Sequence, residues 1–208
     1  FTLEGLACVL VEPNVPADPE RRWFWRARFF GAFPFVDFAL LKRGWHVAHV
    51  AVDELYGSPE SNRRFDVLHA FLASLGFNRK CALAGFSRGG LDSCNWAVRN
   101  PAKVSSLYLD NAVCDFKSWP GGKGRGPGDS ASWHRCLAAW GFTEAQALAF
   151  EGNPVDNLKP LADARIPLLL VCGDADEVVP PDENSAIVER RYRDLGGDIE
   201  IIHKPGAG

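Results

Sequence analysis

A single turn in the middle of the chain constrains the fold most. The pentapeptide Gly85–Gly89, GFSRG, joins the short apolar run Cys81–Ala84 to the amphipathic run Leu91–Arg99. This order predicts a strand, a sharp turn and a helix. The glycines allow a turn tight enough to hold Ser87 in a strained conformation, and the N-terminus of the following helix favours negative charge. The pattern therefore predicts an exposed, nucleophilic serine; the alternative is a glycine-rich turn with an inert serine.

Short apolar, β-branched runs alternate with amphipathic runs on both sides of this turn. The predicted strands are Ala7–Val11, Trp23–Phe29, His46–Val52, Lys80–Ala84, Ser105–Leu109, Pro167–Cys172 and Asp198–Ile202. The predicted helices are Pro34–Lys42, Asn62–Leu75, Arg88–Arg99 and Glu183–Leu195. Such alternation favours an α/β fold with a mostly parallel sheet of about seven visible strands and helices on both faces.

The rhythm breaks in one long segment, residues 111 to about 160. It carries a glycine-rich loop, 119–128, and two expected short helices, around 132–139 and 143–151. A long insertion in a compact domain is usually functional or mobile, so we expect a small cap over the site. The chain of 208 residues is then one domain. It starts at Phe1 and contains no Met, so we expect truncation at both ends and leave the compartment open.

Composition argues against several classes of partner. A formal net charge of −3 gives no electrostatic reason to bind nucleic acid or an anionic membrane. No run reaches the eighteen apolar residues of a membrane span. The spacing of cysteines and histidines matches no metal site, and no glycine-rich nucleotide fingerprint follows a strand, so no metal or cofactor is expected. Cys114 and Cys136 lie in the irregular segment and would pair only in an exported protein.

The carboxylate expected to assist the serine follows the predicted strand 167–172. The motif GDADEVVP places three carboxylates just past that strand end, where open α/β sheets build their sites. We assign Asp176 as the acid because a nucleophile on such a turn is followed by an acid and then by a histidine. Asp174 and Glu177 are then surface carboxylates of the loop, and Asp110, after the preceding strand, is the runner-up.

The histidine is the difficult part of the assignment. Four histidines come before the acid and are in the wrong order: His46, His49, His69 and His134. His203 alone follows Asp176, but it lies at the end of the strand 198–202, about five residues early for a loop position. We therefore expect the general base just beyond Gly208, with His203 as the alternative.

Five motifs together resemble a known superfamily. GFSRGG, GDADEVVP and HKPGAG, with WRARFFGAFP and CDFKSWPGGKGRG, resemble the serine-nucleophile α/β-hydrolases, most closely a bacterial esterase or prolyl-oligopeptidase-like branch. The resemblance covers nearly the whole chain and is specific for the superfamily, not for a substrate. It implies the α/β-hydrolase fold, Ser87 as the nucleophile and Asp176 as the acid of a catalytic triad.

The same resemblance places the oxyanion hole in the segment 25–28, WRAR, which departs from the His-Gly-Gly of many relatives. We expect the backbone N–H of Arg88 as the first donor and that of Ala27 as the second. The side chains of Arg26 and Arg28 are either structural ion pairs or a clamp for a substrate carboxylate. Trp119 is a candidate for contact with a sugar or an aromatic group.

These residues predict hydrolysis of a carboxylic ester through an acyl-enzyme. The expected partner is a small-molecule or saccharide ester, such as an acylated or methyl-esterified carbohydrate. Two alternatives stay open: an oligopeptidase-type serine peptidase, and a non-catalytic scaffold that lacks the triad histidine.

Overall fold

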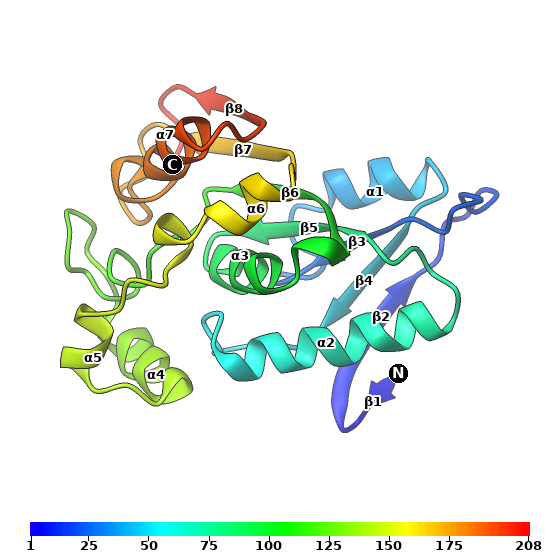
Figure 1. Cartoon of the computed structure of the whole chain (residues 1–208), viewed down its shortest axis with the longest axis horizontal. Coiled ribbons are helices and arrows are strands. Elements are labelled where there is room, and N and C mark those ends of the chain that lie inside the picture. Colours follow the sequence, from blue (N-terminus) through cyan, green and yellow to red (C-terminus); the bar gives the residue numbers. More distant parts are fainter.

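Short runs rich in aliphatic and aromatic residues form the strands where the sequence pattern predicts them. The computed structural model describes all 208 residues. Its strands are β1 (Thr2–Leu3), β2 (Leu6–Val11), β3 (Trp23–Arg26), β4 (His46–Val50), β5 (Cys81–Phe86), β6 (Val104–Asp110), β7 (Leu168–Gly173) and β8 (Ile199–Lys204). They form one sheet in the order β1-β2-β4-β3-β5-β6-β7-β8 (Figure 1).

The sheet is mostly parallel, as predicted. β2 is antiparallel to both of its neighbours, β1 and β4, and every other pair of neighbouring strands is parallel. The strand that the sequence pattern missed is β1. It has only two residues and is joined to β2 by a tight turn at Glu4 and Gly5, both with positive φ.

Seven α-helices connect these strands. They are α1 (Phe35–Leu41), α2 (Pro59–Ser74), α3 (Gly89–Arg99), α4 (Ser130–Trp140), α5 (Glu144–Leu148), α6 (Lys159–Asp163) and α7 (Ser185–Asp194). Single 3₁₀ turns lie at Pro101–Lys103, Pro154–Asp156 and Pro181–Glu183. The ribbon shows α1 on one face of the sheet and α2 and α3 on the other (Figure 1). None of these helices has the length and apolar character needed to cross a membrane.

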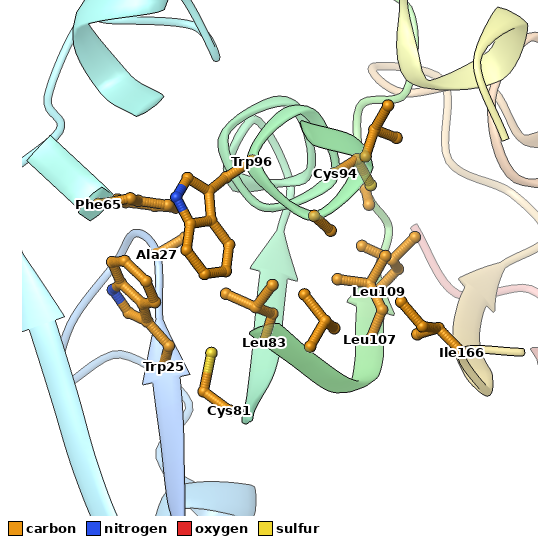
Figure 2. Packing of buried hydrophobic residues seen from close by; sticks show 14 of the residues in the cluster. Trp25, Ala27, Phe65, Cys81, Leu83, Cys94, Trp96, Leu107, Leu109 and Ile166 are labelled. Carbon is orange, nitrogen blue, oxygen red and sulfur yellow. The ribbon is translucent and has the colours of Figure 1, made fainter. Parts of the chain in front are cut away.

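The main core lies between the sheet and the layer that contains α2 and α3. Trp25 from β3 is fully buried, with its ring centroid 4.0 Å from that of Phe65 on α2 and 5.1 Å from that of Trp96 on α3. Leu83 and Leu107 extend the same layer across β5 and β6 (Figure 2). Alternate residues of β3 and β5, such as Phe24 and Ala84, face α1 and form a smaller cluster. Two covered faces explain why the central strands read as continuous apolar runs.

The segment between β6 and β7 contributes most of a second, smaller core, which we call the cap cluster. Its buried residues are Tyr56, Leu91, Val113, Phe116, Trp133, Cys136, Ala147 and Val179. α4 begins at its N-cap Asp129, whose carboxylate accepts a hydrogen bond from the N–H of Ser132, and ends at Gly141 with φ 67°. α5 begins with a complete capping box between Thr143 and Gln146.

The cysteines are all buried free thiols. Cys114 belongs to the main core and Cys136 to the cap cluster, so the pairing considered for these two does not occur. Cys114 instead faces Cys94. A hydrogen bond with the Cys94 thiol, together with burial, holds the pKa of Cys114 well above its ordinary value.

The register of the parallel strands brings their carboxyl ends to one edge. Phe86 at the end of β5 lies opposite Asp110 at the end of β6, and Asp110 lies opposite Val171 near the end of β7. The loops that follow these strands therefore meet at that edge. They carry Ser87 and Asp176.

Candidate active site

Ser87 occupies the sharp turn between β5 and α3 that the pentapeptide predicts. Its φ is 48°, a conformation that non-glycine residues rarely adopt. The turn is fixed by its backbone: the Ser87 N–H donates to the Asp110 carbonyl at 3.0 Å, and the Ser87 carbonyl accepts from the Val113 N–H at 2.8 Å and the Gly90 N–H at 3.0 Å. A strained serine held in this way is typical of a nucleophile exposed above a sheet.

The glycines around Ser87 are required by close packing. A Cβ on Gly85 would stand 2.8 Å from the Cα of Gly90, and a Cβ on Gly90 would stand 2.6 Å from the carbonyl oxygen of Val113. At Gly89 the space is less tight, with the Cβ of Arg28 at 3.2 Å. Gly90, which directly follows the pentapeptide, is therefore more tightly constrained by packing than Gly89.

Ser87 borders a cavity of about 670 Å³ at the carboxyl edge of the sheet. Most of its wall is apolar or aromatic, and its polar groups gather near the strand ends. The lining residues are Phe29, Phe33, Phe35, Val36, Phe86, Ser87, Tyr108, Asp110, Asn111, Val171, Gly173, Lys204, Ala207 and Gly208. A cavity of this size beside a strained serine has room for a small organic substrate.

The backbone N–H of Arg88 is free, as an oxyanion donor must be. It donates no hydrogen bond within the chain. The expected second donor, Ala27, is wrong: its N–H donates to the Ala84 carbonyl at 3.3 Å, which continues the pairing of β3 with β5. The N–H groups of Arg28 and Phe29 have no acceptor in the chain. The Arg28 nitrogen lies 3.6 Å from the position of a Cβ on Gly89, so its amide lies beside the start of α3.

The two arginines of this loop are buried, so the clamp for a substrate carboxylate does not fit them. Arg26 is fully buried and pairs with Asp37 of α1 at 3.0 Å. The Arg28 side chain is 5% exposed and pairs with Asp53 at 3.3 Å. Burial lowers the pKa of both guanidinium groups. The alternative, structural ion pairs, describes both side chains.

Glu54 links the turn at Ser87 to the cap. Its carboxylate pairs with Arg88 at 3.1 Å and with Arg135 of α4 at 2.8 Å, and it also accepts a hydrogen bond from the Tyr56 hydroxyl. The Arg88 guanidinium lies 5.7 Å from the ring centroid of Trp119. Trp119 is partly exposed but does not line the cavity, so its contact with substrate stays a prediction.

Asp176 lies on the loop after β7 and is nearly buried, with 9% of its surface exposed. Its Oδ1 accepts hydrogen bonds from the N–H groups of Val178 at 2.9 Å and Val179 at 2.8 Å. Its Oδ2 makes no hydrogen bond in the chain and is not fully enclosed. The carboxylate is therefore fixed through one oxygen, and the other oxygen can accept a hydrogen bond from an imidazole.

The last residues of the chain lie against the Asp176 loop. The Ala175 N–H donates to the Ala207 carbonyl at 2.8 Å. A Cβ on Gly208 would stand 3.0 Å from the Ala175 carbonyl oxygen and 3.3 Å from the Cα of Asp176. Ala207 and Gly208 also line the cavity that Ser87 borders. The carboxyl end of Gly208 is thus close to both the acid and the serine cavity.

His203 is placed differently. Its Nδ1 lies 2.8 Å from Oδ1 of Asp174, and 54% of its side chain is exposed. The next residue of β8, Lys204, lines the cavity. Successive side chains of a strand point to opposite faces, so His203 points away from that cavity. The structure pairs His203 with Asp174 and leaves Asp176 without a histidine partner.

The histidines that precede the acid have other roles. The rings of His46, His49 and His69 are packed against aromatic side chains, namely Phe77, Phe30 and Trp96. Burial lowers the pKa of these three histidines. His134 lies in the cap, where its Nδ1 contacts the Ser130 carbonyl at 2.8 Å.

Two polar residues at the carboxyl end of β6 complete the edge of the cavity. Asp110, the runner-up acid, accepts a hydrogen bond from the Tyr108 hydroxyl at 2.7 Å. Burial and this carboxylate raise the pKa of Tyr108. Asn111 has φ 41°, and its Oδ1 accepts from the Gly173 N–H at 2.7 Å, which ties β6 to the end of β7. Sequence reasoning missed Asn111; its position directly after a strand was the signal. No group of three or more His, Cys, Asp or Glu side chains is placed to bind a metal.

Asp92 of α3 is a buried carboxyl group beneath the turn, and its raised pKa can be tested by experiment. Its buried carboxylate accepts from the Gly57 N–H at 2.8 Å and the Ser61 hydroxyl at 2.7 Å, and Arg28 adds a favourable charge. Burial outweighs these effects and raises the pKa of Asp92 from 3.8 to about 6. The folded state then binds a proton more tightly than the unfolded state, so this group makes stability fall as pH rises from about 4 to about 6.

We therefore expect Asp92→Asn to flatten the pH dependence of stability. The free energy of unfolding of the variant, relative to the original chain, should rise by roughly 2–3 kcal/mol from acid to neutral pH. Urea denaturation at a series of pH values measures this difference. Parallel profiles for the two proteins would contradict a raised pKa at Asp92.

Comparisons with known proteins agree on the architecture. No family model and no curated protein matches the sequence. The structure is similar to dipeptidyl peptidase 4 from Porphyromonas gingivalis, with a TM-score of 0.71, 14% identity, and 97% of this chain and 30% of that chain covered. It is also similar to acylaminoacyl peptidase from Pyrococcus horikoshii, with a TM-score of 0.71, 15% identity, and coverage of 97% and 35%.

A third similar structure is a membrane phospholipase A described as a bacterial virulence factor, with a TM-score of 0.57 and 19% identity; 100% of this chain and 78% of that chain are covered. The chain spans 30–35% of the length of the two peptidases. At these identities the likeness shows the fold. The strand order, the one antiparallel strand β2 and the serine turn after β5 agree with this fold. The chain therefore has the α/β-hydrolase fold.

Proposed function

We propose that this chain is the catalytic domain of a serine hydrolase that cleaves a carboxylic ester through an acyl-enzyme. The observation that carries the proposal is Ser87 at φ 48°, on the turn between β5 and α3, at the border of a cavity. A strained serine in this place is costly for the fold and is retained where its hydroxyl is needed. The free amide of Arg88 and the half-bonded carboxylate of Asp176 support the same role.

In the proposed reaction the Ser87 hydroxyl attacks the ester carbonyl while a histidine takes its proton. The oxyanion is stabilised by the backbone N–H of Arg88 and, in place of Ala27, by that of Arg28. The histidine then protonates the leaving alcohol, and water hydrolyses the acyl-enzyme by the same steps in reverse. Asp176 orients the imidazole through its free oxygen.

We place the general base in the position directly after Gly208. That position starts beside Asp176 and the cavity, because the end of the chain contacts Ala175 and lines the cavity wall. The competing assignment, His203, would require its side chain to leave Asp174 and cross to the other face of β8.

Binding of a saccharide would need accessible tryptophan rings, and fewer of them are available than the sequence suggests. Trp133 is buried in the cap cluster, and the Trp140 indole donates to the Tyr56 carbonyl at 3.0 Å. Trp119 is partly exposed and lies beside the Arg88 guanidinium, next to the serine turn. The apolar wall formed by Phe29 and Phe33 fits an apolar group on either side of the ester.

A peptidase of the oligopeptidase type is the second candidate. The two similar structures with the higher TM-scores are named as peptidases, and the same residues would serve an amide bond. Parallel assays on ester and anilide substrates with the same acyl group separate the two activities. A non-catalytic scaffold is the third candidate, because no histidine of the 208 residues lines the cavity.

The deciding experiment is treatment with a fluorophosphonate, followed by intact mass and mapping of the modified peptide. The 208-residue chain is compared with a version extended by the encoded residues that follow Gly208. Labelling at Ser87 only in the extended version supports a base after Gly208. Rapid labelling of the 208-residue chain would assign the base to His203. A folded protein that is unlabelled in both versions would contradict the proposed function.

A further inference from the structure

Arg26, the last residue of β3, is the most completely buried charged residue near the serine turn, with none of its surface exposed. Its Nη1 donates to the Asp37 carboxylate at 3.0 Å. The other contacts of its guanidinium are backbone carbonyls of the loop that follows β3. Nε donates to the Arg28 carbonyl at 3.3 Å, and Nη2 donates to the carbonyls of Phe29, at 3.4 Å, and Ala32.

These bonds span the loop that carries the free amides. A guanidinium is planar and holds its donors in a rigid fork, so three carbonyls bonded to one group are fixed relative to one another. Phe29 has φ 53° and the Ala32 N–H donates back to the Phe29 carbonyl at 2.9 Å, which closes a tight turn around the side chain. The loop is therefore folded around Arg26.

The same side chain also contacts the strand that ends at the serine. The Arg26 guanidinium carbon lies 3.7 Å from the ring centroid of Phe86, the residue before Ser87. The Arg26 carbonyl accepts from Nδ1 of His49 at 2.8 Å, which ties this point of the chain to β4. One buried side chain thus links the loop, α1 and β5.

We propose that Arg26 is a positioning residue that holds the loop of the free Arg28 and Phe29 amides in the orientation needed beside the oxyanion formed at Ser87; the Arg28 carbonyl that it binds shares a peptide plane with the Phe29 N–H. It touches no substrate, because it is fully enclosed. Its effect passes through the loop of residues 28–32. The proposal rests on the proposed function for the meaning of the oxyanion, whereas the shape of the loop can be measured without catalysis.

The matched variants are Arg26→Lys, Arg26→Gln and Asp37→Asn. Lysine keeps the charge but cannot reach three carbonyls and a carboxylate from one fork. Asp37→Asn removes the charge of the one side-chain partner of Arg26 and leaves its bonds to the loop carbonyls in place. This variant therefore measures the loss of stability that comes from disturbing the buried ion pair alone. The thermal stability of each variant is measured first.

With an extended chain that hydrolyses p-nitrophenyl acetate, we expect kcat for both Arg26 variants to fall by about two to three orders of magnitude, as for loss of one oxyanion donor. KM should change little, because the ground-state ester does not need the donor. Asp37→Asn should lose stability but keep kcat within several-fold. Equal losses of kcat in Asp37→Asn, or full kcat in Arg26→Lys, would overturn the proposal.

Hydrogen–deuterium exchange of the peptide that covers residues 27–33 gives a readout independent of turnover. We expect faster exchange in Arg26→Gln than in Asp37→Asn, most of all at Ala32, whose N–H is bonded in the folded loop. Unchanged exchange in Arg26→Gln would overturn the role of Arg26 in the loop. Failure of the extended chain to hydrolyse any ester would contradict the proposed function instead, and the exchange data would still decide the role of Arg26.

Discussion

Replacing Ser87 by alanine is expected to abolish fluorophosphonate labelling and to reduce ester hydrolysis by at least about four orders of magnitude. The reason is that covalent catalysis needs the hydroxyl, and the oxyanion donors alone leave only about 10³–10⁴-fold acceleration over water. The measurement is kcat/KM on one ester together with intact mass after labelling. Ser93→Ala is the control, because Ser93 lies about one turn into α3, and its hydroxyl donates to the Ala84 carbonyl at 2.8 Å.

Replacing Ser87 by glycine is expected to lower activity but to raise the stability of the protein. Glycine adopts φ 48° without strain, and the strain of a non-glycine residue in this region is of order 1–3 kcal/mol. Ser87→Gly should therefore be inactive and more stable than the original protein, while Ser87→Ala should be inactive without that gain. An active Ser87→Gly variant would show that another residue is the nucleophile. A less stable one would show that the turn at Ser87 is not strained.

Asp176→Asn is expected to lower kcat by about four orders of magnitude with little change in KM. The amide cannot stabilise an imidazolium, and it favours the wrong tautomer of the histidine, as in Ser-His-Asp proteases. The substitution keeps one oxygen to accept the hydrogen bonds from Val178 and Val179. Steady-state kinetics on the extended chain, with far-UV spectra of both proteins, separate a catalytic loss from a folding loss.

Asp174→Asn is the matched control for this prediction. Its carboxylate lies on the same loop but is paired with His203 and half exposed. We expect kcat to stay within several-fold, because that pair points away from the serine cavity. If Asp174→Asn loses activity and Asp176→Asn does not, then Asp174 and His203 are the acid and the base.

Much of the fold was predictable because its signals are local. Alternation of apolar and amphipathic runs predicted seven of the eight strands, and the missed β1 has only two residues. Ser87 was predictable for the same reason, since strand, turn and helix are adjacent in the chain. The end of β3 was harder to predict from the sequence. The strand was expected to reach Phe29, but it ends at Arg26 because the chain turns around the Arg26 side chain.

The details of the candidate site depend on partners that are distant in sequence. The Ala27 amide was excluded as an oxyanion donor only by its bond to Ala84, which is set by the register of β3 against β5. The burial of Arg26 depends on Asp37 of α1 and on Phe86 of β5. Such neighbours cannot be read from the spacing of residues along the chain, and charged side chains are rarely buried without them.

The cap cluster determines which parts of the segment between β6 and β7 can change without disturbing the rest of the fold. The segment between β6 and β7 contributes five of the eight buried residues of the cap cluster, and Tyr56, Leu91 and Val179 anchor it to the rest of the chain. Replacements within α4 and α5 alter only the cap cluster, whereas Val155, Leu158 and Leu161 of the same segment belong to the main core, and the Val113 N–H holds the Ser87 carbonyl. Exchange of α4 and α5 is therefore expected to leave the main core in place, whereas a deletion that reaches residues 155–161 would open it.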